Sequence, residues 1–258
     1  MVLTLALGQC GYDVEVVATP ACFGSSAVQP MAVSNSGVVV GTMLNTCSGA
    51  TTDAFVWSAA TGFQIIDFGV DIVSAHARGI TESGVIVGDV NTTTGILQGF
   101  RFVDGEVTLL DLIDGANLSI ANDVNAAGVA TGYSQNDIVG QPDHAVIWRN
   151  GAVEDLTPLL GQPQSRAGGI GDAGHVVGRM GLRYFDSSGF VLHDGEVIDI
   201  GVPAGDDVSE LVAVNGLGQA VGFSRFVGDP GWPRRPIRWT PNGGLQVLPL
   251  LEGTTTGT

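Results

Sequence analysis

Side chains able to bind a ligand are concentrated in the segment Phe223–Arg235. Trp232 lies there between Asp229 and the pair Arg234 and Arg235. An aromatic ring flanked by an acid and two guanidinium groups can stack on a sugar ring or hold an anion. The alternative, that Trp232 packs against its own loop, stays open. Three further binding candidates fall in equivalent segments of the chain: Tyr133, Arg183 and Tyr184.

Catalysis has less support in the sequence. The four histidines show no metal-ligand spacing: they are His76, His144, His175 and His193. The motifs HExxH and GxSxG are absent. Carboxylates on predicted loops could form a glycosidase pair, the candidates being Asp114, Asp137, Asp143, Asp206 and Asp207. These carboxylates could also hold calcium, although no DxDxDG-type loop is present. We therefore expect no cofactor, with calcium as the alternative.

The charge composition excludes several classes of function. The ten basic residues are all arginine, so lysine Schiff-base chemistry and a P-loop lysine are both excluded. With 26 acidic residues the formal net charge is −16. Binding to nucleic acid depends on neutralising phosphates with basic side chains, so we expect no nucleic-acid partner.

Glycines recur along the chain at a nearly constant spacing. They mark repeated structural elements, which must position the candidate residues. One glycine returns every 44 to 47 residues, at Gly37, Gly84, Gly128, Gly174 and Gly218. A second glycine follows four residues later each time, at Gly41, Gly88, Gly132, Gly178 and Gly222. A phrase such as "AFVWS" or "AVIWRNG" and then a phrase such as "QIIDFG" or "VIDIG" follow each pair. Internal repeats of this length are typical of solenoids and propellers.

Each repeat predicts four short strands. In the second repeat they cover about 77–80, 85–90, 99–103 and 106–111, joined by "TESG" and "DG" turns. Four antiparallel strands per repeat predict an all-β β-propeller of about five four-stranded repeats of ~45 residues. The repeats span about 30–70, 76–113, 120–157, 166–201 and 210–251 within a domain 12–258. Tryptophans at one repeat position predict packing between neighbouring blades: Trp57, Trp148 and Trp239.

Two features of the chain ends and strand ends complete the fold prediction. A further strand is expected at 12–18, before the first repeat, so the ring is either closed with one surplus strand or an open arc of six or more blades. We favour the arc. Aspartates at the end of the fourth strand are predicted to form turns, and they are Asp67, Asp111, Asp155 and Asp199.

The repeats resemble a family of bacterial extracellular proteins, the HAF repeats. The resemblance rests on "DAFVW" at Asp53–Trp57, "HAVIW" at His144–Trp148 and "AVNGLGQAVG" at Ala213–Gly222. It covers about 12–251, but a histidine stands in the family triplet only at His144. The resemblance implies a propeller-like, exported protein and implies no particular activity.

The first residues also point to export. "MVLTLALG" is apolar and ends in small residues, as the end of a signal peptide does, so 1–11 is expected to be a leader remnant. Cys22 and Cys47 flank the first copy of the repeated glycine phrase and could form a disulfide, which would suit a secreted or cell-surface protein. Cys10 is then left over. No stretch has the roughly 18 apolar residues of a membrane helix.

Loops of variable sequence between strands two and three, and between repeats, are expected to share one face of a propeller. Because binding sites usually lie on such loops, the sequence favours a non-catalytic binding module for a glycan or a protein. The alternative is a propeller glycosidase or lyase that uses loop carboxylates. A purely structural role at the cell surface is a third hypothesis.

Overall fold

A computed structural model describes most of the chain, namely residues 5–6, 13–14, 28–45, 51–136, 141–183, 185–228, 231 and 233–249. These residues form strands and one short helix, α1 (Thr157–Leu160). None of the described helical structure is long and apolar enough to cross a membrane. The strand pair β1 (Leu5–Ala6) and β2 (Asp13–Val14) precedes the main fold.

Strands β3 to β14 form a 12-stranded sheet and β15 to β22 an 8-stranded sheet. Within them consecutive strands make five antiparallel groups of four, here called units 1 to 5, and single parallel pairs link units 1 to 2, 2 to 3 and 4 to 5. Unit 1 comprises β3 (Val28–Val33), β4 (Val39–Asn45), β5 (Thr51–Ser58) and β6 (Gly62–Ile65). Unit 2 comprises β7 (Ile72–Ile80), β8 (Ile86–Thr92), β9 (Leu97–Val103) and β10 (Glu106–Leu109). Unit 3 comprises β11 (Leu118–Val124), β12 (Ala130–Gln135), β13 (His144–Arg149) and β14 (Ala152–Asp155). Unit 4 comprises β15 (Gln164–Ile170), β16 (Val176–Arg183), β17 (Asp186–His193) and β18 (Glu196–Gly201). Unit 5 comprises β19 (Val208–Val214), β20 (Ala220–Arg225), β21 (Arg235–Thr240) and β22 (Gly244–Val247).

Each unit is an antiparallel meander in which consecutive strands are neighbours. The first strand is longer than the repeat pattern predicts: β7 begins at Ile72 rather than near 77. The reason is a parallel contact at Ser74, which pairs with Thr52 of unit 1 and holds the earlier residues in extended conformation. The predicted N-terminal strand is described only as β2, and its partner is β1.

The turns follow the residues that the repeats supply. Gly84, the first repeat glycine of unit 2, has φ +84°, a backbone conformation that other residues avoid. The hairpin between β9 and β10 has Asp104 at φ 51° and Gly105 at φ 88°. Positive φ at both positions is the type I′ turn that the "DG" pair predicts. Asn150–Gly151 and Asp194–Gly195 repeat it in units 3 and 4.

The second repeat glycine is required by a bulge in the first strand. In unit 2 the pairing shifts between Ala77 and Gly79, and this brings a carbonyl group against the second strand. A Cβ atom on Gly88 would overlap the carbonyl oxygen of His76. The same overlap exists in the other units, so only glycine fits this position of each repeat.

The hydrophobic core lies between consecutive units rather than within them. One cluster joins units 1 and 2, and three others join units 2 and 3, 3 and 4, and 4 and 5. Trp148 is 1% exposed in one of these clusters, and its Nε1 donates to the carbonyl oxygen of Asp111 in unit 2 at 2.7 Å. The predicted packing between neighbours is therefore confirmed for Trp148, and Trp239 is buried in the same way.

Buried serines link the units by hydrogen bonds. Ser119, Ser165 and Ser209 occupy the same position of the first strand, and each is fully buried. Each hydroxyl accepts a backbone N–H from the third strand of the preceding unit, at 2.8 to 3.0 Å. Neighbouring units are thus joined by polar as well as apolar contacts.

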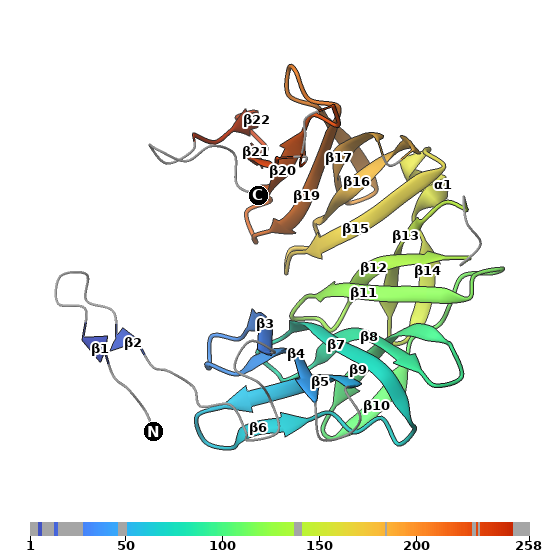
Figure 1. The fold of residues 1–258 in the computed structure, drawn as a ribbon. Helices are drawn as coiled ribbons and strands as arrows, with labels where there is room; N and C mark the ends of the chain where they lie inside the picture. Colours follow the sequence, from blue (N-terminus) through green and yellow to red (C-terminus); the bar gives the residue numbers. More distant parts are fainter. Residues whose placement is uncertain are drawn as a thin grey trace.

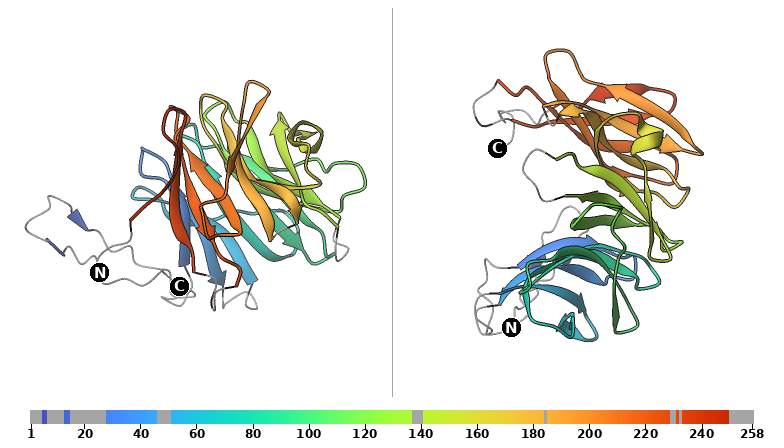
Figure 2. Two further views of the ribbon diagram at one scale, coloured as in Figure 1. Left: turned by 90° about the horizontal axis from the view of Figure 1, so that it is seen from above. Right: turned by 90° about the vertical axis from the view of Figure 1, so that its right-hand side faces the viewer.

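The units are arranged as an arc, with units 1 and 5 at its two ends (Figure 1). The views in Figure 2 show the sheets standing side by side around the hollow of the arc. Apolar residues are exposed at both ends, since Val33 of β3 is 65% exposed and Val221 of β20 is 45% exposed. The residues equivalent to Val221 in units 1, 2 and 4 are fully buried by the following unit, and they are Val40, Val87 and Val177.

Candidate functional site

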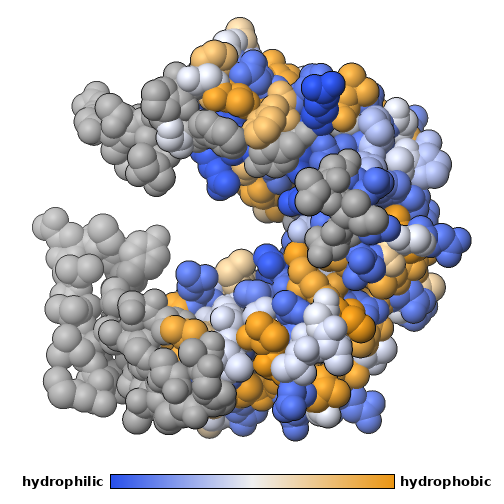
Figure 3. Space-filling view, turned by 45° about the vertical axis from the view of Figure 1, so that its right-hand side comes forward, coloured by the Kyte–Doolittle hydropathy of each residue, from blue (hydrophilic) through white to orange (hydrophobic). Residues whose placement is uncertain are grey.

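The strongest candidate site is a cavity on the inner side of the arc. It has a volume of about 800 Å³ and is lined by residues from all five units, mostly from the first strands β3, β7, β11, β15 and β19. The hollow of the arc is visible in the space-filling view (Figure 3). A cavity of this size falls within the range of small-molecule sites.

Arginine is concentrated in this cavity. Four of the ten arginines in the chain line it, and they are Arg78, Arg166, Arg179 and Arg234. Two acidic residues, Asp123 and Glu210, line it as well. The chain has a net charge of −16, so these guanidinium groups concentrate positive charge in the cavity of an otherwise acidic protein.

Arg166 is held from two sides. Its Nε donates to Asp143 Oδ2 at 2.5 Å, and its guanidinium carbon lies 4.1 Å from the centre of the Tyr133 ring. Burial alone would lower the pKa of Arg166, but the hydrogen bond to Asp143 and the nearby Tyr133 raise it above its usual value. Burial raises the pKa of the Tyr133 hydroxyl, so the phenol stays protonated. Arg166 is therefore a permanent cation.

Arg78 is anchored in a similar way. Its Nε donates to Asp89 Oδ1 at 2.5 Å, while Asp89 Oδ2 lies 2.8 Å from His76 Nδ1. Asp89 and Asp143 are 2% and 3% exposed, so both carboxylates lie behind the arginines that they hold. Both arginines line the cavity, and each contacts its carboxylate through the Nε atom.

Arg234 lines the cavity from unit 5. Its guanidinium carbon is 4.2 Å from the centre of the Phe223 ring, a cation–π contact. Among the described residues no carboxylate forms an ion pair with Arg234. It differs in this from Arg235, whose Nη2 and Nε contact Asp206 Oδ2 at 2.5 and 2.9 Å.

The residues predicted from the sequence are only partly brought together. Arg234 lines the cavity, and its guanidinium carbon is 4.2 Å from the ring centre of Phe223. The ring centre of Tyr133 is 4.1 Å from the guanidinium carbon of Arg166, which also lines the cavity. Arg235 is engaged with Asp206, and Arg183 is exposed at the end of β16. Five predicted residues lie outside the described residues: Trp232, Asp229, Tyr184, Cys22 and Cys47.

The sequence reasoning missed the first-strand positions that face the cavity. The residues eight before the first repeat glycine are Gln29, His76, Ile120, Arg166 and Glu210. The residues six before it are Met31, Arg78, Asn122, Gly168 and Val212. All five residues at the second of these positions line the cavity, whereas only Arg166 and Glu210 do so at the first, and both positions differ in every repeat. A position that changes in every repeat, at a constant distance from a repeated glycine, is the signal that could have identified the site.

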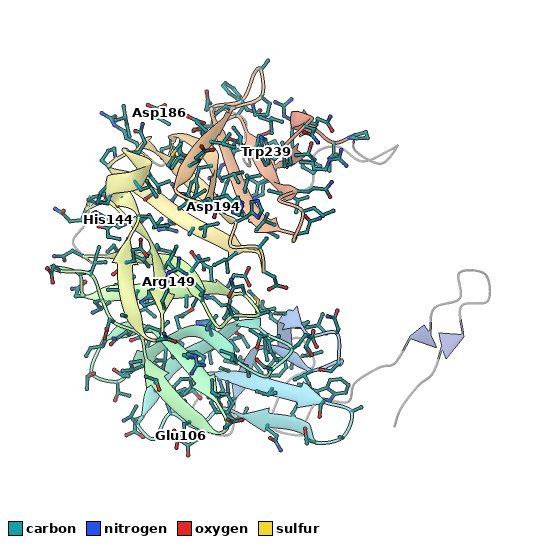
Figure 4. The ribbon with its side chains drawn as sticks, turned by 180° about the vertical axis from the view of Figure 1, so that it is seen from behind. Glu106, His144, Arg149, Asp186, Asp194 and Trp239 are labelled. Atoms are coloured by element: carbon teal, nitrogen blue, oxygen red, sulfur yellow. The ribbon has the colours of Figure 1, made fainter. Side chains whose placement is uncertain are left out.

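The other candidate groups are held in local contacts. The predicted turn aspartates are confirmed at three positions, because Asp67, Asp155 and Asp199 each accept a backbone N–H two residues ahead at 2.8 Å. His144, labelled in Figure 4, lies 3.0 Å from Asp155 Oδ2. The part of the chain that the structure describes contains no group of three His, Cys, Asp or Glu residues placed to hold a metal ion. Asp137 lies outside that part.

The fold has relatives among solved structures. An acylaminoacyl peptidase from Pyrococcus horikoshii superposes with a TM-score of 0.52 at 13% identity, covering 92% of this chain and 39% of that chain. TolB from Acinetobacter baumannii matches with a TM-score of 0.48 at 16% identity, covering 72% of this chain and 45% of that chain. The β-propeller domain of the Trilobed protease from Pyrococcus furiosus matches with a TM-score of 0.45 at 12% identity. The match covers 98% of this chain and 94% of that chain.

The chain thus has an all-β, propeller-like fold, given by its strand pairing and its likeness to the peptidase. It spans less than half the length of the peptidase and of TolB, and the similar structures include both enzymes and other proteins. No protein-family model and no curated protein sequence matches the chain, so the HAF-repeat resemblance stays a prediction.

Proposed function

We propose that the chain is an exported β-propeller binding module. It holds its ligand in the cavity on the inner side of the arc, here called the central cavity. The observation that carries this proposal is the pair Arg78 and Arg166, each fixed through Nε by a buried carboxylate. Side chains fixed in this way lose little conformational freedom on binding. The proposal of export, and of a glycan or protein ligand, comes from the sequence.

Binding is favoured over catalysis because the carboxylates at the cavity are already engaged. Asp89 and Asp143 accept hydrogen bonds from arginine. Asp123 accepts the N–H groups of Val124 and Ile170 at 2.8 and 2.9 Å. A glycosidase needs two carboxylates that face the substrate about 5–10 Å apart. The carboxylates with these partners serve the architecture of the cavity instead.

One observation favours the enzymatic alternative at another place. A smaller cavity of about 350 Å³ in unit 4 is lined by Asp186, Asp199 and Asp207. Asp199 accepts the N–H of Gly201, and Asp207 accepts the N–H of Val227. Asp186 is the group best suited to act as an acid or base there. Hydrolysis of a glycan that is lost in Asp186→Asn would support this second candidate function.

The ring is proposed to be completed by at least one further unit of the same kind. The support comes from Val221, which is 45% exposed although Val40, Val87 and Val177 at the equivalent position are fully buried. A unit packed on β20 as unit 5 packs on unit 4 would cover it. Val221→Glu is expected to leave the monomer folded and to reduce self-association in analytical ultracentrifugation.

The binding proposal is tested on an array of glycans and peptides with the purified chain. Arg234→Gln and Arg78→Lys alter the cavity, whereas Arg149→Gln removes an arginine that lies 59% exposed beside Glu154. Binding that is lost in the two cavity variants and retained in Arg149→Gln supports the proposal. Binding that all three variants retain equally would overturn it.

A further inference from the structure

We infer that the ligand of the central cavity is a saccharide unit that carries a single carboxylate, that is, a uronic acid. This inference rests on the proposed function and names the ligand class of the same site. It follows from the geometry of the guanidinium groups, from the balance of charge around them and from the aromatic rings beneath them.

The geometry favours a planar anion. Arg78 and Arg166 are both held at Nε, by Asp89 and Asp143. With Nε engaged, each guanidinium keeps its two terminal amino groups as donors, an edge suited to two parallel hydrogen bonds. A carboxylate accepts such a pair with both oxygens, in the fork-to-fork arrangement typical of arginine. Arg234 of unit 5 adds a third guanidinium to the lining of the cavity.

The charge balance favours one negative charge rather than many. Arg78 and Arg166 are each matched by a buried aspartate, and Arg179 lies 3.8 Å from Glu210. Among the described residues Arg234 is the cavity arginine that forms no ion pair with a carboxylate, and Asp123, the remaining carboxylate of the lining, accepts two backbone N–H groups. A polyphosphate or a heavily sulfated chain would bring more charge than the cavity compensates, and the net charge of −16 would repel it. A ligand with one negative charge on an otherwise neutral molecule brings no excess charge into the cavity and is repelled less by the chain.

The body of the ligand is expected to be a sugar ring. Arg166 and Arg234 line the cavity, and their planar guanidinium groups lie over the rings of Tyr133 and Phe223, of which Phe223 also belongs to the lining. Flat surfaces of this kind suit the face of a pyranose ring, while the free guanidinium donors suit its hydroxyl oxygens. The cavity volume of about 800 Å³ accommodates a short oligosaccharide.

Isothermal titration calorimetry with four probes tests the inference: glucuronate, glucose, succinate and an acetylated dipeptide with a free carboxyl terminus. We expect measurable binding for glucuronate and at least about tenfold weaker binding for the other three, since each lacks the ring or the carboxylate. Binding is expected to weaken at high ionic strength. An oligouronate should bind more tightly than the single unit.

Variants separate this inference from the proposed function. Arg234→Gln removes no partner of a buried carboxylate, so it is expected to fold normally by circular dichroism and to weaken glucuronate binding about tenfold. Arg149→Gln, with the same charge change, is expected to bind as the unaltered chain does. Equal binding of glucose and glucuronate that Arg234→Gln abolishes would overturn the uronate while leaving the cavity site. Equal or tighter binding of succinate or the dipeptide would also overturn it.

Discussion

Arg166 and Tyr133 belong to different units, yet the guanidinium carbon of Arg166 lies 4.1 Å from the centre of the Tyr133 ring. The contact crosses the boundary between β12 of unit 3 and β15 of unit 4. Asp143, which precedes β13 of unit 3, holds the same arginine at Nε. The wall of the cavity is therefore assembled from neighbouring units, and its geometry depends on how they pack.

Removal of the Tyr133 ring is expected to weaken the protein. In Tyr133→Ala the half-buried ring and its contact with Arg166 are lost, so the free energy of unfolding should fall by about 2 kcal/mol. Tyr133→Phe keeps the ring and should lie within about 0.5 kcal/mol of the unaltered chain. Urea unfolding followed by circular dichroism measures both. Equal stability of the alanine and phenylalanine variants would show that the stack contributes nothing.

Ser209 links units 4 and 5 through two hydrogen bonds. Its hydroxyl accepts the N–H of Gly189 at 2.8 Å and donates to the carbonyl oxygen of Gly201 at 2.6 Å. Ser209→Ala leaves the buried Gly189 N–H without an acceptor, which should cost about 1–3 kcal/mol. Ser83→Ala at an exposed turn is the control and should change stability by less than about 0.5 kcal/mol. Similar unfolding midpoints for the two variants would contradict this role.

The repeated glycines could be read from the sequence because the backbone alone demands them. Gly88 avoids overlap with the carbonyl of His76, and Gly84 has a positive φ. Such requirements do not depend on which unit lies beside them, so they recur at a constant period. The turn between Asp104 and Gly105 was predictable for the same reason.

The cavity could not be derived in this way. Arg166 meets Asp143 and Tyr133 only because unit 4 packs against unit 3, and neither partner is at a fixed spacing from arginine in the other repeats. Arg78 uses a different arrangement, with Asp89 from the second strand of its own unit. Contacts that differ from unit to unit produce no repeated pattern in the sequence. The residues that make them can therefore be identified only from the packed structure.

The second repeat glycine should tolerate no side chain. Gly132→Ala would bring a Cβ atom into the carbonyl oxygen of Ile120, a backbone atom that cannot move without breaking the pairing of β11 and β12. We expect loss of the folded protein, seen as insoluble expression or the absence of a cooperative melt. Gly128→Ala is the matched control, since its Cβ would meet nothing closer than 4.0 Å and only the φ of +73° is unfavourable. That change should cost about 1–2 kcal/mol.

His175 should make the stability of the protein depend on pH. Its ring stacks on His193 with the centroids 3.8 Å apart, and a Cβ atom on Gly218 of unit 5 would come within 2.8 Å of its Nε2. Burial, and then the neighbouring His193, lower the pKa of His175, whereas the exposed Asp194 opposes the shift. The folded state therefore prefers the neutral ring, and the unfolded chain takes up a proton near its ordinary pKa of 6.5.

Because the unfolded state binds more protons in this range, the free energy of unfolding should decrease as the pH falls below about 6.5. Urea unfolding at pH 7.5, 6.5 and 5.5 measures the decrease. His175→Gln removes the titrating ring, so its loss of stability over the same range should be smaller. The carboxylate of Asp155 does not contribute to the change in stability between pH 7.5 and 5.5. Burial would raise its pKa, but hydrogen bonds from His144 and Thr157 lower it below 3.8. Parallel pH profiles for His175→Gln and the unaltered chain would exclude His175 as the source of the dependence.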